Sequence, residues 1–215
     1  MEIERVNVYA DPRFRQEVLY QHGAYLADGE PWSFLIISDY EAVIEAPPHT
    51  PEALQEMIET FRFHAEHITT FYDESLEVLL RLPRIERREV KIEDLQPSQF
   101  SVDCEKCAAV GQFIHTARDI VIPVLPLPDG RLCVLDGHTR LYEAWRRGLR
   151  TAMVFESKSA EDMRKTLYGF VKEARKRGIY HIHEMACYSP ERQKREWHDW
   201  CDAYFARQNE GGSDE

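Results

Sequence analysis

Five consecutive residues, Asp136, Gly137, His138, Thr139 and Arg140, combine side chains that could bind and transfer a phosphoryl group. A helix is expected to begin here, and the first turn of a helix offers unpaired N–H groups and partial positive charge to a phosphate. Thr139 adds a hydroxyl, Arg140 a planar guanidinium, and His138 a ring N–H. Asp136 could accept a proton from a substrate hydroxyl or hold Mg²⁺. These residue types could therefore bind a phosphate at the helix start and take a proton from a hydroxyl beside it.

The same residues also fit a structural role. Asp136 could cap the helix, Gly137 could serve the turn, and Arg140 could pair with a surface carboxylate. The spacing alone leaves both interpretations open.

The surrounding pattern predicts a strand, the loop and then a helix. Apolar residues at 131–135 indicate the strand, and the helix is expected over 139–147, where Gly148 ends it. The same reasoning predicts three more helices: one over 103–114, one from Ala160 to Arg177 with Ser159 as its N-cap, and one from Ser189-Pro190 onward. It also predicts strands at 120–125 and 151–156. This second part spans residues 91–208, and the polar tail 209–215 is expected to be disordered.

Residues 1–90 form a separate predicted unit. Strands are expected at 23–28 and 32–38, joined by a turn containing Asp28-Gly29, with another at 40–46. Thr50 and Pro51 then begin a helix, and 76–82 is a last strand. The result is a ββ(β)αβ unit, so the whole chain is predicted to be an α+β protein.

The composition restricts the classes of partner. The formal charge of −11 argues against a general nucleic-acid binder, whose surface is normally basic. Its longest apolar runs are too short to span a bilayer, and the first residues lack an apolar secretion signal, so we expect a cytoplasmic protein without membrane contact.

Cysteine and histidine residues do not suggest a redox framework or a metal centre. Five cysteines are an odd number, and Cys104-x-x-Cys107 has no second pair at zinc-ribbon spacing, so buried thiols are expected there. His64 and His67, like His181 and His183, lack an evident third ligand. No metal site made by the protein alone is predicted.

The segment 95–157 resembles the ParB/sulfiredoxin superfamily. The later part, with its tryptophan-rich last helix, is similar to C-terminal extensions of uncharacterised bacterial members that carry a similar DGHTR box. The resemblance rests on Asp94-Leu95-Gln96-Pro97-Ser98-Gln99, Ile122-Pro123-Val124, Asp129-Gly130, Val134–Arg140, Ala144, Gly148-Leu149 and Val154.

Three activities of that superfamily differ in the box. ParB proteins bind CTP through a GERR-like box, of which Gly137 and Arg140 match. Sulfiredoxins use a GGCHR-like box, and His138 stands where their reactive cysteine would be. Free serine kinases have a DGHHR-like box, and Asp136, Gly137, His138 and Arg140 match it. This likeness implies that Asp136 is the base, that Asp136 and His138 are the catalytic residues, and that Gly137, His138, Thr139 and Arg140 bind the nucleotide phosphates. The kinases also have a catalytic glutamate in a region that here reads Pro97-Ser98-Gln99.

We therefore expect a nucleotide-binding protein, such as an ATP- or ADP-dependent kinase of a small hydroxylated metabolite like serine, with Mg²⁺ bridging the phosphates; CTP is the other candidate nucleotide. Two alternatives stay open. One is a non-catalytic nucleotide sensor or interaction module that recognises a protein partner through residues 1–90. The other is a ParB-like DNA-associated regulator, which the acidic charge disfavours.

Overall fold

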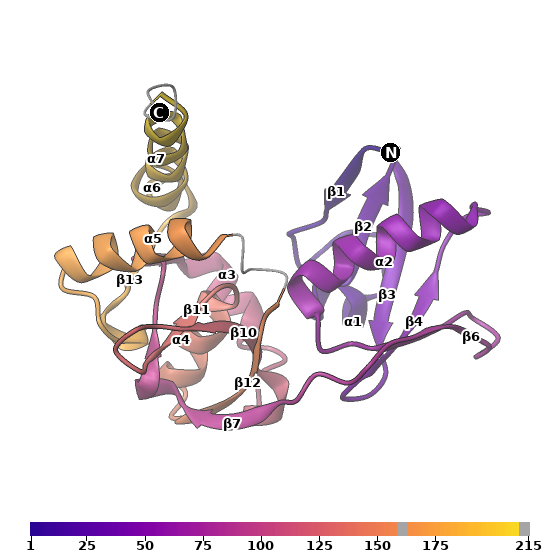
Figure 1. The fold of residues 1–215 in the computed structure, drawn as a ribbon, viewed down its shortest axis with the longest axis horizontal. Coiled ribbons are helices and arrows are strands. Elements are labelled where there is room, and N and C mark those ends of the chain that lie inside the picture. Colours follow the sequence, from indigo (N-terminus) through magenta and orange to yellow (C-terminus); the bar gives the residue numbers. More distant parts are fainter. Residues whose placement is uncertain (159–162, 211–215) are drawn as a thin grey trace. The chain divides into compact units, whose positions relative to one another are not determined.

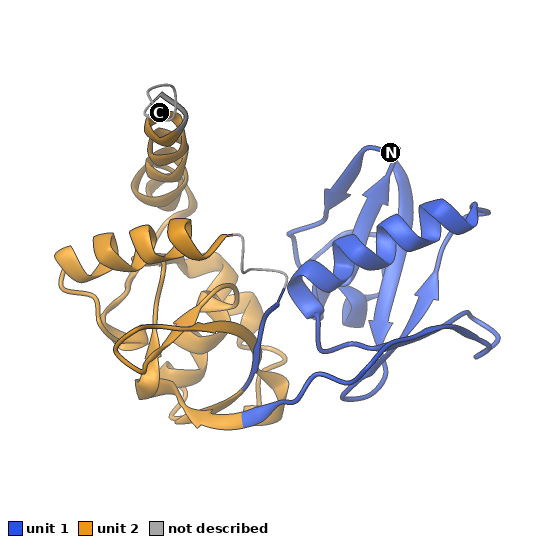
Figure 2. Cartoon of the chain, viewed as in Figure 1, with its two compact units in different colours: residues 1–88, 154–162 blue, residues 89–153, 163–215 orange. Residues whose placement is uncertain are grey.

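The computed structural model describes residues 1–158 and 163–210, and the chain is an α+β protein, as predicted. It divides into two compact units (Figure 2). Unit 1 comprises residues 1–88 and 154–162, and unit 2 comprises residues 89–153 and 163–215. The sequence placed a boundary near residue 90 but did not anticipate that 154–162 would group with the N-terminal part. No helix in the described ranges has both the length and the apolar character needed to cross a bilayer.

Unit 1 is a six-stranded sheet in the order β1-β2-β3-β4-β5-β6 (Figure 1). Neighbouring strands are antiparallel except β4 and β5, which are parallel and are connected through helix α2. The elements are β1 (Ile3–Arg5), α1 (Gln16–Tyr20), β2 (Ala24–Ala27), β3 (Glu30–Ile36), β4 (Glu41–Glu45), α2 (Pro51–Ala65), β5 (Thr70–Tyr72) and β6 (Val78–Arg81).

Local chemistry explains the parts of unit 1 that the sequence predicted. Asp28 and Gly29 both have positive φ, 51° and 87°, which the two-residue turn of a twisted hairpin requires. The Thr50 hydroxyl accepts a hydrogen bond from the Ala53 N–H at 3.2 Å and caps α2. The core is aromatic, with the Phe34 and Phe61 rings stacked at 4.4 Å.

Unit 2 is built on a second sheet in the order β7-β12-β10-β11-β8 and a separate parallel pair, β13-β9. β10 and β11 form an antiparallel hairpin, and β11 pairs parallel with β8. The strands are β7 (Arg88–Lys91), β8 (Leu95–Gln96), β9 (Ser101–Asp103), β10 (Val121–Pro126), β11 (Leu132–Val134), β12 (Thr151–Glu156) and β13 (Ala186–Tyr188). Strands β7 and β12 cross the unit boundary: β7 starts at the last residue of unit 1, and β12 ends in unit 1.

The helices of unit 2 agree with the expected order but differ in length. They are α3 (Cys104–Val110), α4 (His138–Arg146), α5 (Arg164–Lys176), α6 (Pro190–Gln193) and α7 (Asp199–Glu210), with a π-helical segment (Lys194–His198) between the last two and 3₁₀ turns at Ile92–Asp94, Ala117–Asp119 and Ile182–Glu184. α3 ends at Val110, before the expected residue 114, and Gly111 is its C-cap. The predicted capping at Ser159 and Ala160 lies outside the described residues. Of the predicted disordered tail, residues 209 and 210 belong to α7, and the rest also lie outside the described ranges.

The cysteines correct one expectation. Cys104, at the start of α3, forms a disulfide with Cys187 of β13, 83 residues later, whereas the sequence argued against disulfides and treated Cys104 as a buried thiol. The spacing of the cysteines along the chain does not reveal this disulfide, because the pairing of β13 with β9 places Cys187 near Cys104. Cys107 and Cys133 are buried thiols, and burial raises the pKa of each to about 12.

Candidate functional site

Helix α4 begins without a side-chain cap. Its N-cap residue is Gly137, in the left-handed conformation with φ 87° and ψ 19°, and the first turn contains no acidic residue. By contrast, Thr50 caps α2 and Asp103 caps α3 through hydrogen bonds to backbone N–H groups. A helix start that lacks such a cap retains donors for a ligand.

Asp136 lies next to this helix start but does not cap it. Its Oδ1 accepts a hydrogen bond from the Gly137 N–H at 2.7 Å, and 39% of its side chain is exposed. Asp136 is therefore not the N-cap of α4, contrary to the alternative in which it caps the helix. The carboxylate is accessible to solvent.

Arg140 lies back over Gly137. Its Nη2 is 4.0 Å from Asp136 Oδ2, and its side chain is only 15% exposed. A Cβ placed on Gly137 would lie 3.1 Å from Arg140 Nη2 and 2.5 Å from Ile122 Cδ1. The guanidinium thus packs close to the helix start and forms an ion pair with the Asp136 carboxylate.

His138 is buried rather than open to solvent. Its Nε2 accepts a hydrogen bond from the Ser98 N–H at 3.2 Å. Because a backbone N–H can only donate, the proton of the neutral ring lies on Nδ1. Burial lowers the pKa of His138 to about 4, partly offset by Asp136, so the ring is neutral at pH 7.

The contact between Ser98 and His138 was not predicted. Ser98 is buried, and its hydroxyl donates to the Val134 carbonyl at 2.7 Å, which ties the segment after β8 to the end of β11. Sequence reasoning noted Ser98 only as part of a matching segment, because its partner is 40 residues away. Gln99 is the next residue, so the segment where the resemblance expects a glutamate adjoins the start of α4.

The remaining predicted residue, Thr139, is half-buried in the first turn of α4. All five residues from Asp136 to Arg140 are thus gathered around one helix start, as their sequence adjacency requires. Across residues 1–158 and 163–210, no three His, Cys, Asp or Glu side chains are grouped so that they could hold a metal ion.

Comparisons with known proteins add little. No protein family matches the chain, and no curated protein matches it. Among solved structures, the crystal structure of protein Atu1540 from Agrobacterium tumefaciens aligns at 16% identity with a TM-score of 0.35. The alignment covers 49% of this chain and 64% of that one, so the chain spans less than two thirds of the protein it matches.

Proposed function

We propose that the start of α4 binds the phosphates of a nucleotide, and that the protein is an ATP- or ADP-dependent kinase of a small hydroxylated metabolite such as serine. The observation that carries this proposal is the uncapped helix start at Gly137, with an exposed carboxylate on one side and a guanidinium on the other.

The residues fit a nucleotide bound with Mg²⁺. The N–H groups of the first turn, the Thr139 hydroxyl and Arg140 supply donors to phosphate oxygens. Asp136 can act as a base or as one oxygen ligand of Mg²⁺. One protein ligand is enough to hold the ion, because Mg²⁺ takes its other ligands from water and phosphate oxygens. The bound nucleotide would supply the phosphoryl group, and the metal would neutralise its charge.

The proposed reaction uses Asp136 as the base. The carboxylate accepts the proton of the substrate hydroxyl while that oxygen bonds to the terminal phosphorus and the bond to the leaving nucleotide breaks. Arg140 stabilises the charge on the transferred group. Such chemistry relies on positioning and charge, which this helix start supplies.

His138 contributes through position under this proposal. A neutral, buried ring whose Nε2 is already occupied by Ser98 holds the loop against the segment after β8. Its backbone N–H, at the first residue of α4, is one of the phosphate donors. A direct catalytic role for the ring stays a prediction.

A turnover experiment tests the kinase. Purified protein is incubated with serine, Mg²⁺ and ATP or ADP, and phosphoserine is detected by mass spectrometry. Asp136→Asn should reduce turnover by about a hundredfold or more, in the range of general-base loss, while nucleotide binding persists. Asp94→Asn, an exposed carboxylate outside the loop, should leave turnover unchanged.

A nucleotide sensor without catalysis is the second candidate, and two observations favour it. Gln99 is neutral where the related kinases have a glutamate. In unit 1, Leu76, Val78 and Leu79 are 64%, 51% and 38% exposed on and beside the edge strand β6, as expected for a protein-binding edge. Nucleotide binding without any phosphorylated product from serine or related hydroxylated metabolites would favour the sensor over the kinase.

A further inference from the structure

The net negative charge of the chain comes entirely from unit 1. Unit 1 contains 9 Lys and Arg against 20 Asp and Glu, whereas unit 2 contains 18 of each. The formal charge of −11 therefore describes unit 1 and says nothing against an anionic ligand for unit 2. Within unit 2, α5 contains five basic residues and a single acidic one, Glu173.

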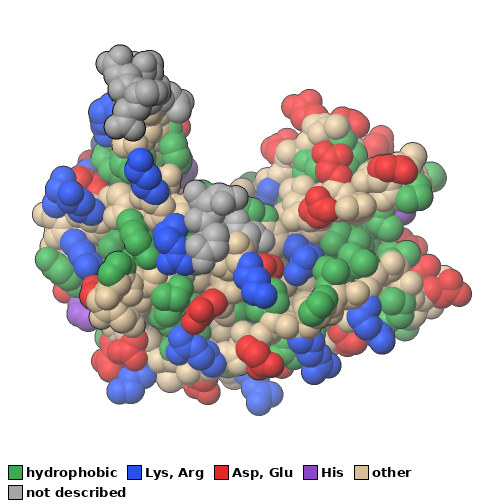
Figure 3. All heavy atoms as spheres, viewed as in Figure 1, with side chains coloured by type: hydrophobic (Ala, Val, Ile, Leu, Met, Phe, Trp, Pro, Cys, Tyr) green, Lys and Arg blue, Asp and Glu red, His purple; other side chains and the backbone are tan. Residues whose placement is uncertain are grey.

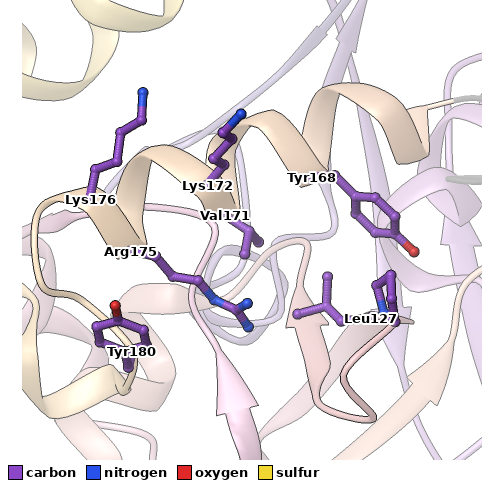
Figure 4. Close-up of a pocket in the computed structure, with 8 residues that line it drawn as sticks. Leu127, Tyr168, Val171, Lys172, Arg175, Lys176 and Tyr180 are labelled. Carbon is purple, nitrogen blue, oxygen red and sulfur yellow. The ribbon is translucent and has the colours of Figure 1, made fainter.

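A hollow of about 440 Å³ lies between α5 and the turn after β10. Leu127, Pro128 and Val171 supply apolar lining. The rings of Tyr168 and Tyr180 lie toward opposite ends of the hollow (Figure 4). Tyr180 is 46% exposed. None of the described residues that line this hollow is acidic. Its size and lining suit a flat ring.

A second hollow, of about 370 Å³, lies between α5 and α7. Trp200 and Tyr204 line it from α7, together with Arg207. Gly169 makes this arrangement possible, because a Cβ at that position would overlap the Tyr204 hydroxyl. α7 is held in place by the contact of Tyr204 with the buried Phe170 ring, whose centroid is 5.1 Å away.

Lys172 and Lys176 line both hollows, one helical turn apart on α5. Figure 4 shows their side chains directed away from Leu127, so they form a ridge between the two hollows. In Figure 3, Lys and Arg side chains gather over α5. Glu173 also lines the second hollow and forms ion pairs with Lys176 Nζ at 3.6 Å and Arg177 Nε at 3.1 Å. Its single charge offsets only part of the five positive charges of α5.

We propose that this face of unit 2 binds single-stranded nucleic acid. The phosphates would lie along Lys172 and Lys176, and bases would enter the hollows on either side and stack on the tyrosine and tryptophan rings. The ridge is basic, and the aromatic rings beside it are exposed (Tyr180) or half-buried (Tyr168, Trp200 and Tyr204). Basic side chains beside aromatic rings are the arrangement that such ligands need. A duplex keeps its bases stacked internally and should bind less tightly.

Binding is measured by fluorescence anisotropy with fluorescein-labelled oligothymidylate and oligouridylate of twelve nucleotides, at several salt concentrations. Lys172→Glu with Lys176→Glu should weaken binding at least tenfold. Losing two phosphate contacts should also make the dependence of log K on log salt shallower by about 1.4. The control is Lys106→Glu with Lys194→Glu, which changes the net charge equally outside both hollows and should have little effect.

A second pair of variants tests the stacking. Tyr180→Ala should weaken binding about fivefold or more, because stacking one base contributes about 1–3 kcal/mol. Phe63→Ala removes an aromatic ring of similar exposure from unit 1 and should have no effect. Circular dichroism confirms that each variant is folded.

Three outcomes would overturn the proposal. They are no binding of either oligonucleotide by the wild-type protein, equal losses in the Lys106/Lys194 control, and tighter binding of a labelled acidic, aromatic peptide than of the oligonucleotides. These readouts need no nucleotide triphosphate, so they are independent of the proposed kinase site.

Discussion

At Gly137 the start of α4 depends on the absence of a side chain. Gly137→Ala would combine an unfavourable positive φ with a Cβ only 2.5 Å from Ile122 Cδ1. We expect a loss of roughly 2–4 kcal/mol of stability, from backbone strain plus overpacking, measured by urea unfolding. Gly148→Ala is the matched control, because Gly148 has the same φ of 87° but no neighbour within 4 Å. Its cost should be smaller, and equal costs would mean that packing around Gly137 is not tight.

His138 should make the stability of the folded protein depend on pH in the acidic range. Its pKa in the folded state is about 4, below the ordinary 6.5, so between these values the unfolded chain binds a proton that the folded chain does not. The contribution of the neutral His138 ring to the free energy of unfolding is therefore fully present above about pH 6.5. It falls as the pH decreases toward 4, by on the order of 3 kcal/mol. His138→Gln should flatten the stability curve between pH 7 and pH 4.5. Parallel curves for the two proteins would show that the ring is not buried as described.

At the scale of elements, the disulfide links β13 to the start of α3. Protein purified in air and denatured should show three free thiols, those of Cys107, Cys133 and Cys201, and five after reduction. A link across 83 residues should raise the stability of the oxidised protein by about 4.5 kcal/mol in the chain-entropy model. Five thiols before reduction would contradict the assignment.

Elements that carry their own signals were predictable from the sequence. The hairpin at Asp28-Gly29 and the capped helix α2 rest on contacts between residues close in the chain. The strands β1, β5, β8, β9 and β13 and helix α1, of two to five residues, were missed because they are too short to show periodicity. In the candidate site, the five-residue loop was predictable, but the Ser98 contact and the burial of His138 depend on distant residues.

At the scale of the molecule, the net charge of the whole chain hides a difference in net charge between the two units. Unit 1 alone accounts for the −11, because the charges of unit 2 balance. The expectation that nucleic acid is an unlikely partner therefore rested on a charge that belongs to unit 1. Residues 154–162 are grouped with unit 1, although unit 2 residues precede them along the chain. In unit 1, the Ser157 hydroxyl and the Lys158 N–H donate to the buried Glu66 carboxylate and hold this segment.

The central claim is that the start of α4 binds nucleotide phosphates, and calorimetric titration of the whole protein with ATP, ADP and CTP in the presence of Mg²⁺ tests it most directly. We predict saturable binding of at least one nucleotide at a single site. Arg140→Gln should weaken it at least tenfold, whereas Arg118→Gln, an exposed arginine outside the loop, should not. Failure of the wild-type protein to bind any of the three nucleotides, or equal affinity in Arg140→Gln, would contradict the account.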